Sequence, residues 1–114
     1  MRIAIVAVAF NRIESISRLL KSIDNAYYPE KVTLIISIDK SDTDIVEKYA
    51  HQFNWTHGEK RVVLHSYNLG LRAHMLSLGR YFDEFDALII LEDDISVSPS
   101  FYLYTKALLS TKIR

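Results

Sequence analysis

Four short runs of hydrophobic residues recur along the chain, each about as long as a β-strand. β-Branched and other apolar side chains dominate them, which is typical of parallel strands that are covered on both faces. The runs are Ile3–Phe10, Val32–Ile38, Arg61–Ser66 and Ala87–Leu91. The third has the shortest apolar part and ends in polar residues. We expect four strands at these positions.

The segments between the runs repeat apolar residues at helical spacing. The first helix is expected to begin near Ile13 and to break at Tyr28-Pro29, since the residue before a proline disfavours the helical conformation. Three further helices are predicted at residues 45–53, at residues 71–82 and from Ser98-Pro99 onward. Proline is favoured in the first turn of a helix, which supports the last of these starts.

Polar residues ahead of the first two helices are expected to cap them. Asn11 is followed by Glu14 three residues later, which is the spacing of a capping box. Ser41 or Asp42 stands in the same place before the second helix and can accept a hydrogen bond from its first free amides.

Strands and helices alternate four times, which is the pattern of an α/β protein. The predicted fold is a Rossmann-like, doubly wound and mostly parallel sheet in three layers, helix, sheet and helix. Residues 1–114 contain no linker, internal repeat or low-complexity tract. A chain of this length usually forms one domain, so one domain is expected.

The residues that end the strands carry most of the polar chemistry. In open α/β sheets, ligands bind in the crevice at the carboxyl ends of the strands. The residues at these ends are Asn11 and Arg12, then Asp39, then Tyr67 and Asn68, and finally Glu92, Asp93 and Asp94. Although they are scattered in the sequence, they should share one rim in space.

Composition narrows the range of partners. Lys and Arg number 14, as do Asp and Glu, so the formal net charge is zero and neither nucleic acid nor an anionic membrane surface is expected as the main partner. The chain has no cysteine, which excludes disulfides and thiolate metal sites. The run Ile3–Phe10 is too short to span a bilayer, and no cleavage site follows it. We therefore expect no integral membrane segment and a location in the cytoplasm or at the membrane periphery.

The acidic triplet Glu92-Asp93-Asp94 is the strongest candidate for chemistry. Three carboxylates directly after a buried strand repel one another and raise each other's pKa, and a cation would relieve this repulsion. Oxygen ligands suit Mg²⁺ or Mn²⁺, which also bridge to phosphate oxygens and can neutralise a diphosphate leaving group. The alternative is a solvated acidic turn in which Asp94 caps a short helical segment.

Three other positions could hold a ligand. Asp39 could accept a hydrogen bond from a base or ribose, or could be an ordinary turn residue. Arg12 could donate to a phosphate or a base carbonyl, or could be a surface arginine in an unfavourable place near a helix amino end. Arg72 and His74 lie at the start of the third helix, where anions often bind, although a single histidine more often packs or is solvated.

Two nucleotide-binding motifs are absent from the chain. The turn Ala9-Phe10-Asn11-Arg12 lacks the glycines of a dinucleotide fingerprint, which argues against a dinucleotide-binding domain with Asp39 on a ribose. No glycine-rich phosphate loop with Lys and Ser or Thr is present either. Receiver and Toprim-like domains need acidic residues after the first strand, where Asn11-Arg12 stands, and are disfavoured.

Taken together, the motifs resemble glycosyltransferases of the GT-A fold, especially the N-acetylglucosaminyltransferase I branch and related family 2-like enzymes, whose acidic motif has a Glu-Asp-Asp form. The resemblance spans nearly the whole chain in the family's order. Four stretches carry it: residues 5–12 (IVAVAFNR), 36–39 (ISID), 68–74 (NLGLRAH) and 91–101 (LEDDISVSPSF). The last is the most specific, because it extends well beyond a bare acidic motif.

The resemblance implies a divalent-metal-dependent transferase that uses a UDP-sugar, with UDP-N-acetylglucosamine as a candidate donor and Mn²⁺ or Mg²⁺ as cofactor. By the same resemblance, Arg12 contacts the nucleotide, Asp39 the uracil, and Arg72 or His74 the base or phosphate. Glu92 and Asp93 would contact sugar and ribose, and Asp94 the metal. Phe10 and Asn11 belong to the nucleotide-binding stretch after the first strand.

The resemblance covers only the N-terminal, donor-binding part of these enzymes. The part that holds the acceptor and, in inverting enzymes, the catalytic base comes after the metal motif. We therefore expect a truncated chain, or a natural fragment that acts with a partner or as a homo-oligomer, and no general base is assigned. The alternative to an enzyme is a module that binds a nucleotide-sugar without transferring it, and the carbohydrate acceptor stays unassigned.

Overall fold

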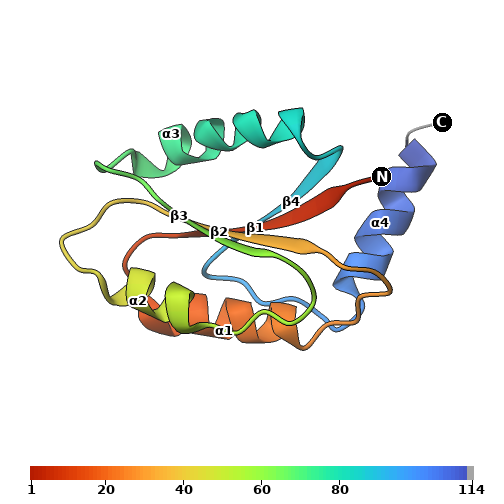
Figure 1. Cartoon of the computed structure of the whole chain (residues 1–114), viewed down its shortest axis with the longest axis horizontal. Helices are drawn as coiled ribbons and strands as arrows, with labels where there is room; N and C mark the ends of the chain where they lie inside the picture. Colours follow the sequence, from red (N-terminus) through yellow and green to blue (C-terminus); the bar gives the residue numbers. More distant parts are fainter. Residues whose placement is uncertain (113–114) are drawn as a thin grey trace.

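The protein is an α/β domain in which every strand is followed by a helix (Figure 1). The computed structural model describes residues 1–112. The elements in chain order are β1 (Ile3–Ala9), α1 (Ile13–Asp24), β2 (Thr33–Ile38), α2 (Ile45–Gln52), β3 (Lys60–Leu64), α3 (Gly70–Ser77), the 3₁₀ helix η1 (Leu78–Asp83), β4 (Ala87–Glu92) and α4 (Phe101–Lys112). The predicted alternation of strands and helices is confirmed.

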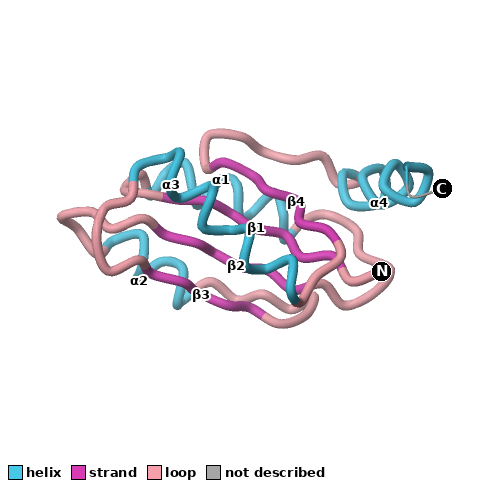
Figure 2. Tube along the Cα trace, turned by 90° about the horizontal axis from the view of Figure 1, so that it is seen from above, coloured by secondary structure: helices cyan, strands magenta, loops and turns pink. Residues whose placement is uncertain are grey.

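The four strands form one parallel sheet in the order β3-β2-β1-β4. Helices α1 and α2 cover one face, α3 and η1 cover the other, and α4 lies beyond the amino ends of the strands (Figures 1 and 2). The chain therefore winds to one side of β1 through β2 and β3, and returns to the other side with β4. This is the doubly wound, three-layer arrangement that the sequence predicts.

Burial follows the position of each strand in the sheet. All seven residues of β1 are buried, since β1 has a strand on either side and helices on both faces. One hydrophobic cluster joins the sheet to α1 and α2, and a smaller one joins it to α3 and η1. Strand β4 has a partner on one side only among the described residues, and its Ile90 is 40% exposed.

The structure corrects both predicted helix caps. Arg12 occupies the N-cap position of α1, and neither it nor Asn11 makes a side-chain cap bond. Asp44 occupies that position in α2, again without a side-chain bond. The hydroxyl of Ser41 instead accepts from the backbone N–H of Thr43. A serine hydroxyl that hydrogen-bonds within its own turn is not available to cap a helix, and Ser41 bonds within its turn.

Two predicted helices begin or end differently in the structure. The helix expected at residues 71–82 is α-helical only to Ser77 and then tightens into η1. Gly79 lies at this change, and glycine is a weak helix former. The last helix begins at Phe101 and not at Pro99, because the carbonyl of Pro99 accepts a hydrogen bond from Tyr27 N–H in the turn that follows α1.

Helix α4 is attached to the rest of the domain by apolar packing of Phe101, Tyr102 and Leu109 and by polar contacts with Glu30. Tyr102 is 1% exposed and donates to Glu30 at 2.9 Å, and Lys106 pairs with the same carboxylate at 2.6 Å. Among residues 1–112, no helix combines the length and hydropathy needed to cross a membrane.

Candidate functional site

A crevice of about 490 Å³ lies at the carboxyl ends of the strands, between the ends of β1 and β4 and the start of α3. The chain leaves β1 toward β2 on one side and meets β4 on the other, so the crevice lies where the winding of the sheet reverses. Ligands of doubly wound sheets bind at this switch point. Its lining residues are Val8, Ala9, Phe10, Arg12, Asp39, Asn68, Gly70, Leu71, His74, Glu92, Asp93 and Asp94.

Most of the residues predicted from the sequence meet in this crevice. Those that line it are Phe10, Arg12, Asp39, His74, Glu92, Asp93 and Asp94. Asn11 and Arg72 are exposed and do not line it. Of the two rim residues predicted after the third strand, Asn68 lines the crevice and the exposed Tyr67 does not. Gly70 and Leu71 also line the crevice but were not predicted, although the Asn68-Leu69-Gly70 turn was a signal for them.

Asp39 is buried at 4% exposure and holds the loop between β3 and α3. Its carboxylate accepts the backbone N–H of Leu69 at 2.8 Å, of Gly70 at 3.0 Å and of Lys40 at 2.9 Å. The first amides of α3, which the sequence suggested as an anion site, therefore already donate to a protein carboxylate. Gly70 has a φ of 77°, a conformation that favours glycine, at this point of the loop.

His74 lies under the crevice and is 2% exposed. Its Nε2 is 2.8 Å from the hydroxyl of Ser37 in β2, and its ring lies edge-on to His65 with centroids 4.9 Å apart. Burial lowers the pKa of His74 below its ordinary value and His65 lowers it further, while the nearby Asp39 charge opposes the change. Burial and His65 thus both favour the neutral form of the ring.

The acidic triplet forms the wall of the crevice at β4. Glu92 is the last residue of the strand and pairs in register with Val8 of β1. Asp93 is half-buried, and burial raises its pKa; Arg12 opposes this rise, and the charges of Asp94 and Glu92 add to it. The negative charges around Asp93 are thus only partly balanced by Arg12.

In the described part of the chain, side chains alone do not form a metal site. Within residues 1–112, no group of three or more His, Asp or Glu side chains is placed to hold one. The crevice does supply oxygen ligands from carboxylates, which is the donor type that Mg²⁺ and Mn²⁺ prefer. A cation here would take most of its ligands from a bound molecule and from water.

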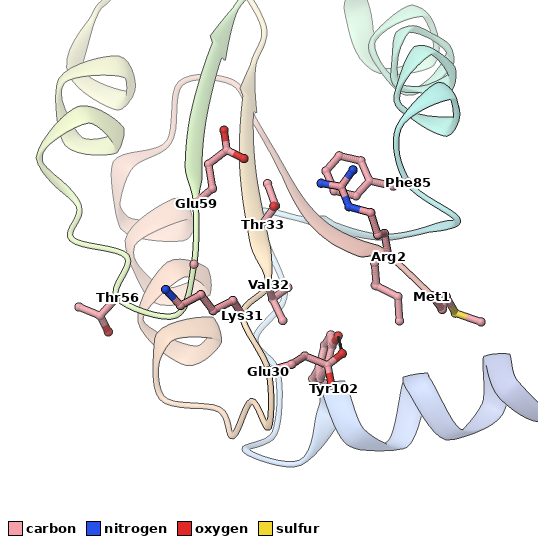
Figure 3. A pocket seen from close by; sticks show the side chains of 12 residues that line it. Met1, Arg2, Glu30, Lys31, Val32, Thr33, Thr56, Glu59, Phe85 and Tyr102 are labelled. Atoms are coloured by element: carbon pink, nitrogen blue, oxygen red, sulfur yellow. Dashed lines mark hydrogen bonds between the residues drawn. The ribbon is translucent and has the colours of Figure 1, made fainter.

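A larger hollow of about 580 Å³ lies at the opposite edge of the sheet, between the amino ends of the strands and α4 (Figure 3). Its polar side chains largely serve the fold: Glu30 holds Tyr102 and Lys106, and the Arg2 guanidinium lies over the Phe85 ring at 4.8 Å. None of the predicted site residues lines this hollow, so we place the candidate site at the carboxyl ends.

Comparison with solved structures finds the same fold in S. aureus TarS. TarS 1-349 in complex with UDP matches with a TM-score of 0.72 at 18% sequence identity, covering 97% of this chain and 32% of that one. TarS 1-349 in complex with UDP-GlcNAc gives the same values. A structure described simply as TarS matches at 0.70 and 19% identity, covering 97% of this chain and 20% of that one.

The chain has a GT-A glycosyltransferase fold. It corresponds to the N-terminal part of that fold and spans about a third of the TarS 1-349 structures. No protein-family model matches the sequence, and the comparison with curated proteins gives no significant match.

Proposed function

We propose that the crevice binds a UDP-sugar together with a divalent cation, and that the chain is the donor-binding part of a glycosyltransferase. One observation supports this above all: residues from separate strand ends and from α3, including a carboxylate triplet and Arg12, line a single crevice at the switch point of a GT-A fold. Structural neighbours of this fold are described as complexes with UDP and UDP-GlcNAc.

Each proposed role follows from position and charge. Asp94 is exposed at the mouth of the crevice and would bind Mn²⁺ or Mg²⁺ together with the donor's diphosphate. Arg12 would contact the nucleotide from the end of β1, and Glu92 and Asp93 would contact the sugar and ribose. Asp39 would reach the uracil with the acceptor capacity that its three amide bonds leave, since two carboxylate oxygens offer about four acceptor sites.

Transfer would break the bond between the anomeric carbon and the diphosphate oxygen while an acceptor hydroxyl attacks that carbon. The cation would neutralise the charge that develops on the departing UDP. The acceptor and the base that deprotonates it are not assigned to any residue of this chain. Binding without transfer is therefore the competing function, and donor hydrolysis or transfer to a sugar distinguishes the two.

The proposal is tested by calorimetric titration of the chain with UDP in the presence of Mn²⁺ and in the presence of a chelator. We expect binding that requires Mn²⁺. In the Asp94→Asn variant we expect this metal-dependent binding to disappear while circular dichroism shows an unchanged fold.

Asp83→Asn is the matched control, because Asp83 is an exposed carboxylate in η1 outside the crevice. It should bind UDP as the natural chain does. If Asp94→Asn retains Mn²⁺-dependent binding, Asp94 is not the ligand. If the natural chain binds no UDP with Mn²⁺, the proposed function is wrong.

A further inference from the structure

Ser37 is a buried hydroxyl in the middle of the sheet. It is fully buried in β2, where its neighbours in sequence, Ile36 and Ile38, are also buried and apolar. A buried hydroxyl is costly unless it is hydrogen-bonded. Its oxygen lies 2.8 Å from Nε2 of His74 on α3 and 3.4 Å from Nε2 of His65 at the end of β3. Ser37 therefore connects the sheet to the helix that forms one wall of the crevice.

Only one nitrogen of His74 is used in this contact. Nε2 faces Ser37, while Nδ1 makes no hydrogen bond to any residue of the described chain. Among the described residues, the only fully buried polar side-chain atom without a hydrogen bond is Oδ1 of Asp24. Nδ1 of His74 therefore keeps some accessibility, and His74 lines the crevice. Nδ1 is the atom of this ring that a bound molecule can reach.

The position of one proton decides what Nδ1 offers to a ligand. A neutral imidazole carries its proton on one nitrogen and accepts on the other. If the Ser37 hydroxyl donates to Nε2, the proton lies on Nδ1, which then is a donor. If Nε2–H donates to Ser37, Nδ1 is an acceptor. The crevice holds the carboxylates of Asp39 and of the triplet at residues 92–94, and a negative environment favours an N–H over a lone pair.

His65 is compatible with the same arrangement. Its Nε2 is close enough to donate to the Ser37 oxygen, which leaves the serine proton free for His74. The charged or titratable groups that act on the His74 ring are His65, just after β3, and Asp39, just after β2. In this arrangement the Ser37 hydroxyl donates to Nε2 of His74, and the Ser37 oxygen accepts from Nε2 of His65.

We infer that Ser37 is a positioning residue of the crevice: its hydroxyl donates to Nε2 of His74 and so presents Nδ1–H to an oxygen of the bound nucleotide. The inference about the ligand rests on the proposed function. The inference about the proton does not, because it concerns the ligand-free chain.

The first test measures the proton directly by nitrogen-15 NMR of the histidine side chains in the ligand-free chain at pH 7.5. We expect His74 to carry its proton on Nδ1. We also expect Ser37→Ala to raise the pKa of His74, because a hydrogen bond donated by serine to Nε2 is available only to the neutral ring. Ser37→Thr keeps the hydroxyl and should restore the natural pKa. An Nε2–H tautomer, or an unchanged or lower pKa in Ser37→Ala, overturns the inference.

The second test measures binding of UDP with Mn²⁺ by the same variants. Ser37→Ala should weaken binding about three- to tenfold, the equivalent of one modest hydrogen bond, and Ser37→Thr should restore it. Ser66→Ala is the control, since Ser66 is an exposed serine outside the crevice.

The two tests separate the inference from the proposed function. If the natural chain binds no UDP, the proposed function fails and the NMR result still decides the role of Ser37. If the tautomer is as expected but Ser37→Ala binds UDP as tightly as the natural chain, Nδ1–H does not contact the nucleotide and the ligand part of the inference is overturned.

Discussion

Replacing Asp39 with asparagine should loosen the wall of the crevice, because its carboxylate holds the chain between β3 and α3. Two oxygens of Asp39 accept from the amides of Leu69 and Gly70, and one of them also accepts from Lys40. Asparagine has nearly the same shape but offers one oxygen and one NH₂ group. One loop amide would then donate to the neutral oxygen of the asparagine, and the other would face its NH₂ group, which cannot accept a hydrogen bond.

The expected loss of stability follows from these contacts. Replacing a charge-assisted bond by a neutral one costs about 1 kcal/mol, and leaving a partly buried donor without an acceptor costs about 1–3 kcal/mol. We therefore expect Asp39→Asn to lower the free energy of unfolding by about 2–4 kcal/mol, a large fraction of the ~5–15 kcal/mol of a typical domain.

Urea unfolding followed by circular dichroism measures this change. With a slope of about 2 kcal/mol per molar urea, the midpoint should fall by about 1–2 M while the slope is unchanged. Asp42→Asn is the matched control, because Asp42 is exposed in the loop that follows Asp39. If the two variants unfold at the same urea concentration, the carboxylate does not hold the loop and our account of this wall is wrong.

Three further results are expected. In Asp94→Ala, Mn²⁺-dependent UDP binding should be lost in calorimetry while the melting temperature changes little; retained binding would exclude Asp94 as ligand. In Gly58→Ala, the added Cβ would overlap the backbone oxygen of Val32, just before β2, so we expect a loss above about 2 kcal/mol on urea unfolding. Gly79→Ala, with nothing within 4 Å of the added Cβ, should be neutral or slightly stabilising; equal effects would contradict the contact. The pKa of His74 is lowered from 6.5 by burial and by His65, so stability should be complete above about pH 6.5 and fall as the pH decreases below it. His74→Gln should flatten that part of the profile, and an unchanged slope would show that His74 does not cause it.

The order of strands and helices could be predicted because each strand that is buried in the fold is an apolar run in the sequence. Strand β1, buried throughout, is an unbroken apolar run in the sequence. The register of one strand against the next cannot be predicted in this way, since it depends on contacts between segments far apart. The caps of α1 and α2 were missed for a related reason: whether a serine or asparagine caps a helix depends on its backbone angles, which residue type alone does not determine.

Only part of the candidate site could be predicted from the sequence. The rule that ligands lie at the carboxyl ends of strands collected Arg12, Asp39 and the triplet at residues 92–94 correctly in one crevice. The amide bonds from the loop to Asp39 join residues 30 and 31 positions apart, and the contact between Ser37 and His74 spans 37. No local sequence pattern indicates these hydrogen bonds, because they form only when α3 packs on the sheet.

The measurement that tests the central claim most directly is a nitrogen-15 heteronuclear NMR titration of the chain with UDP and Mg²⁺. Our account predicts that the backbone amide signals that move are those of the crevice, at residues 8–12, 39–40, 68–74 and 92–94, and that a chelator reverses most of the change. Shifts confined to the hollow at the amino ends of the strands, around Arg2, Lys31 and Thr33, or no shifts at all, would contradict the assignment of the crevice as the nucleotide-sugar site.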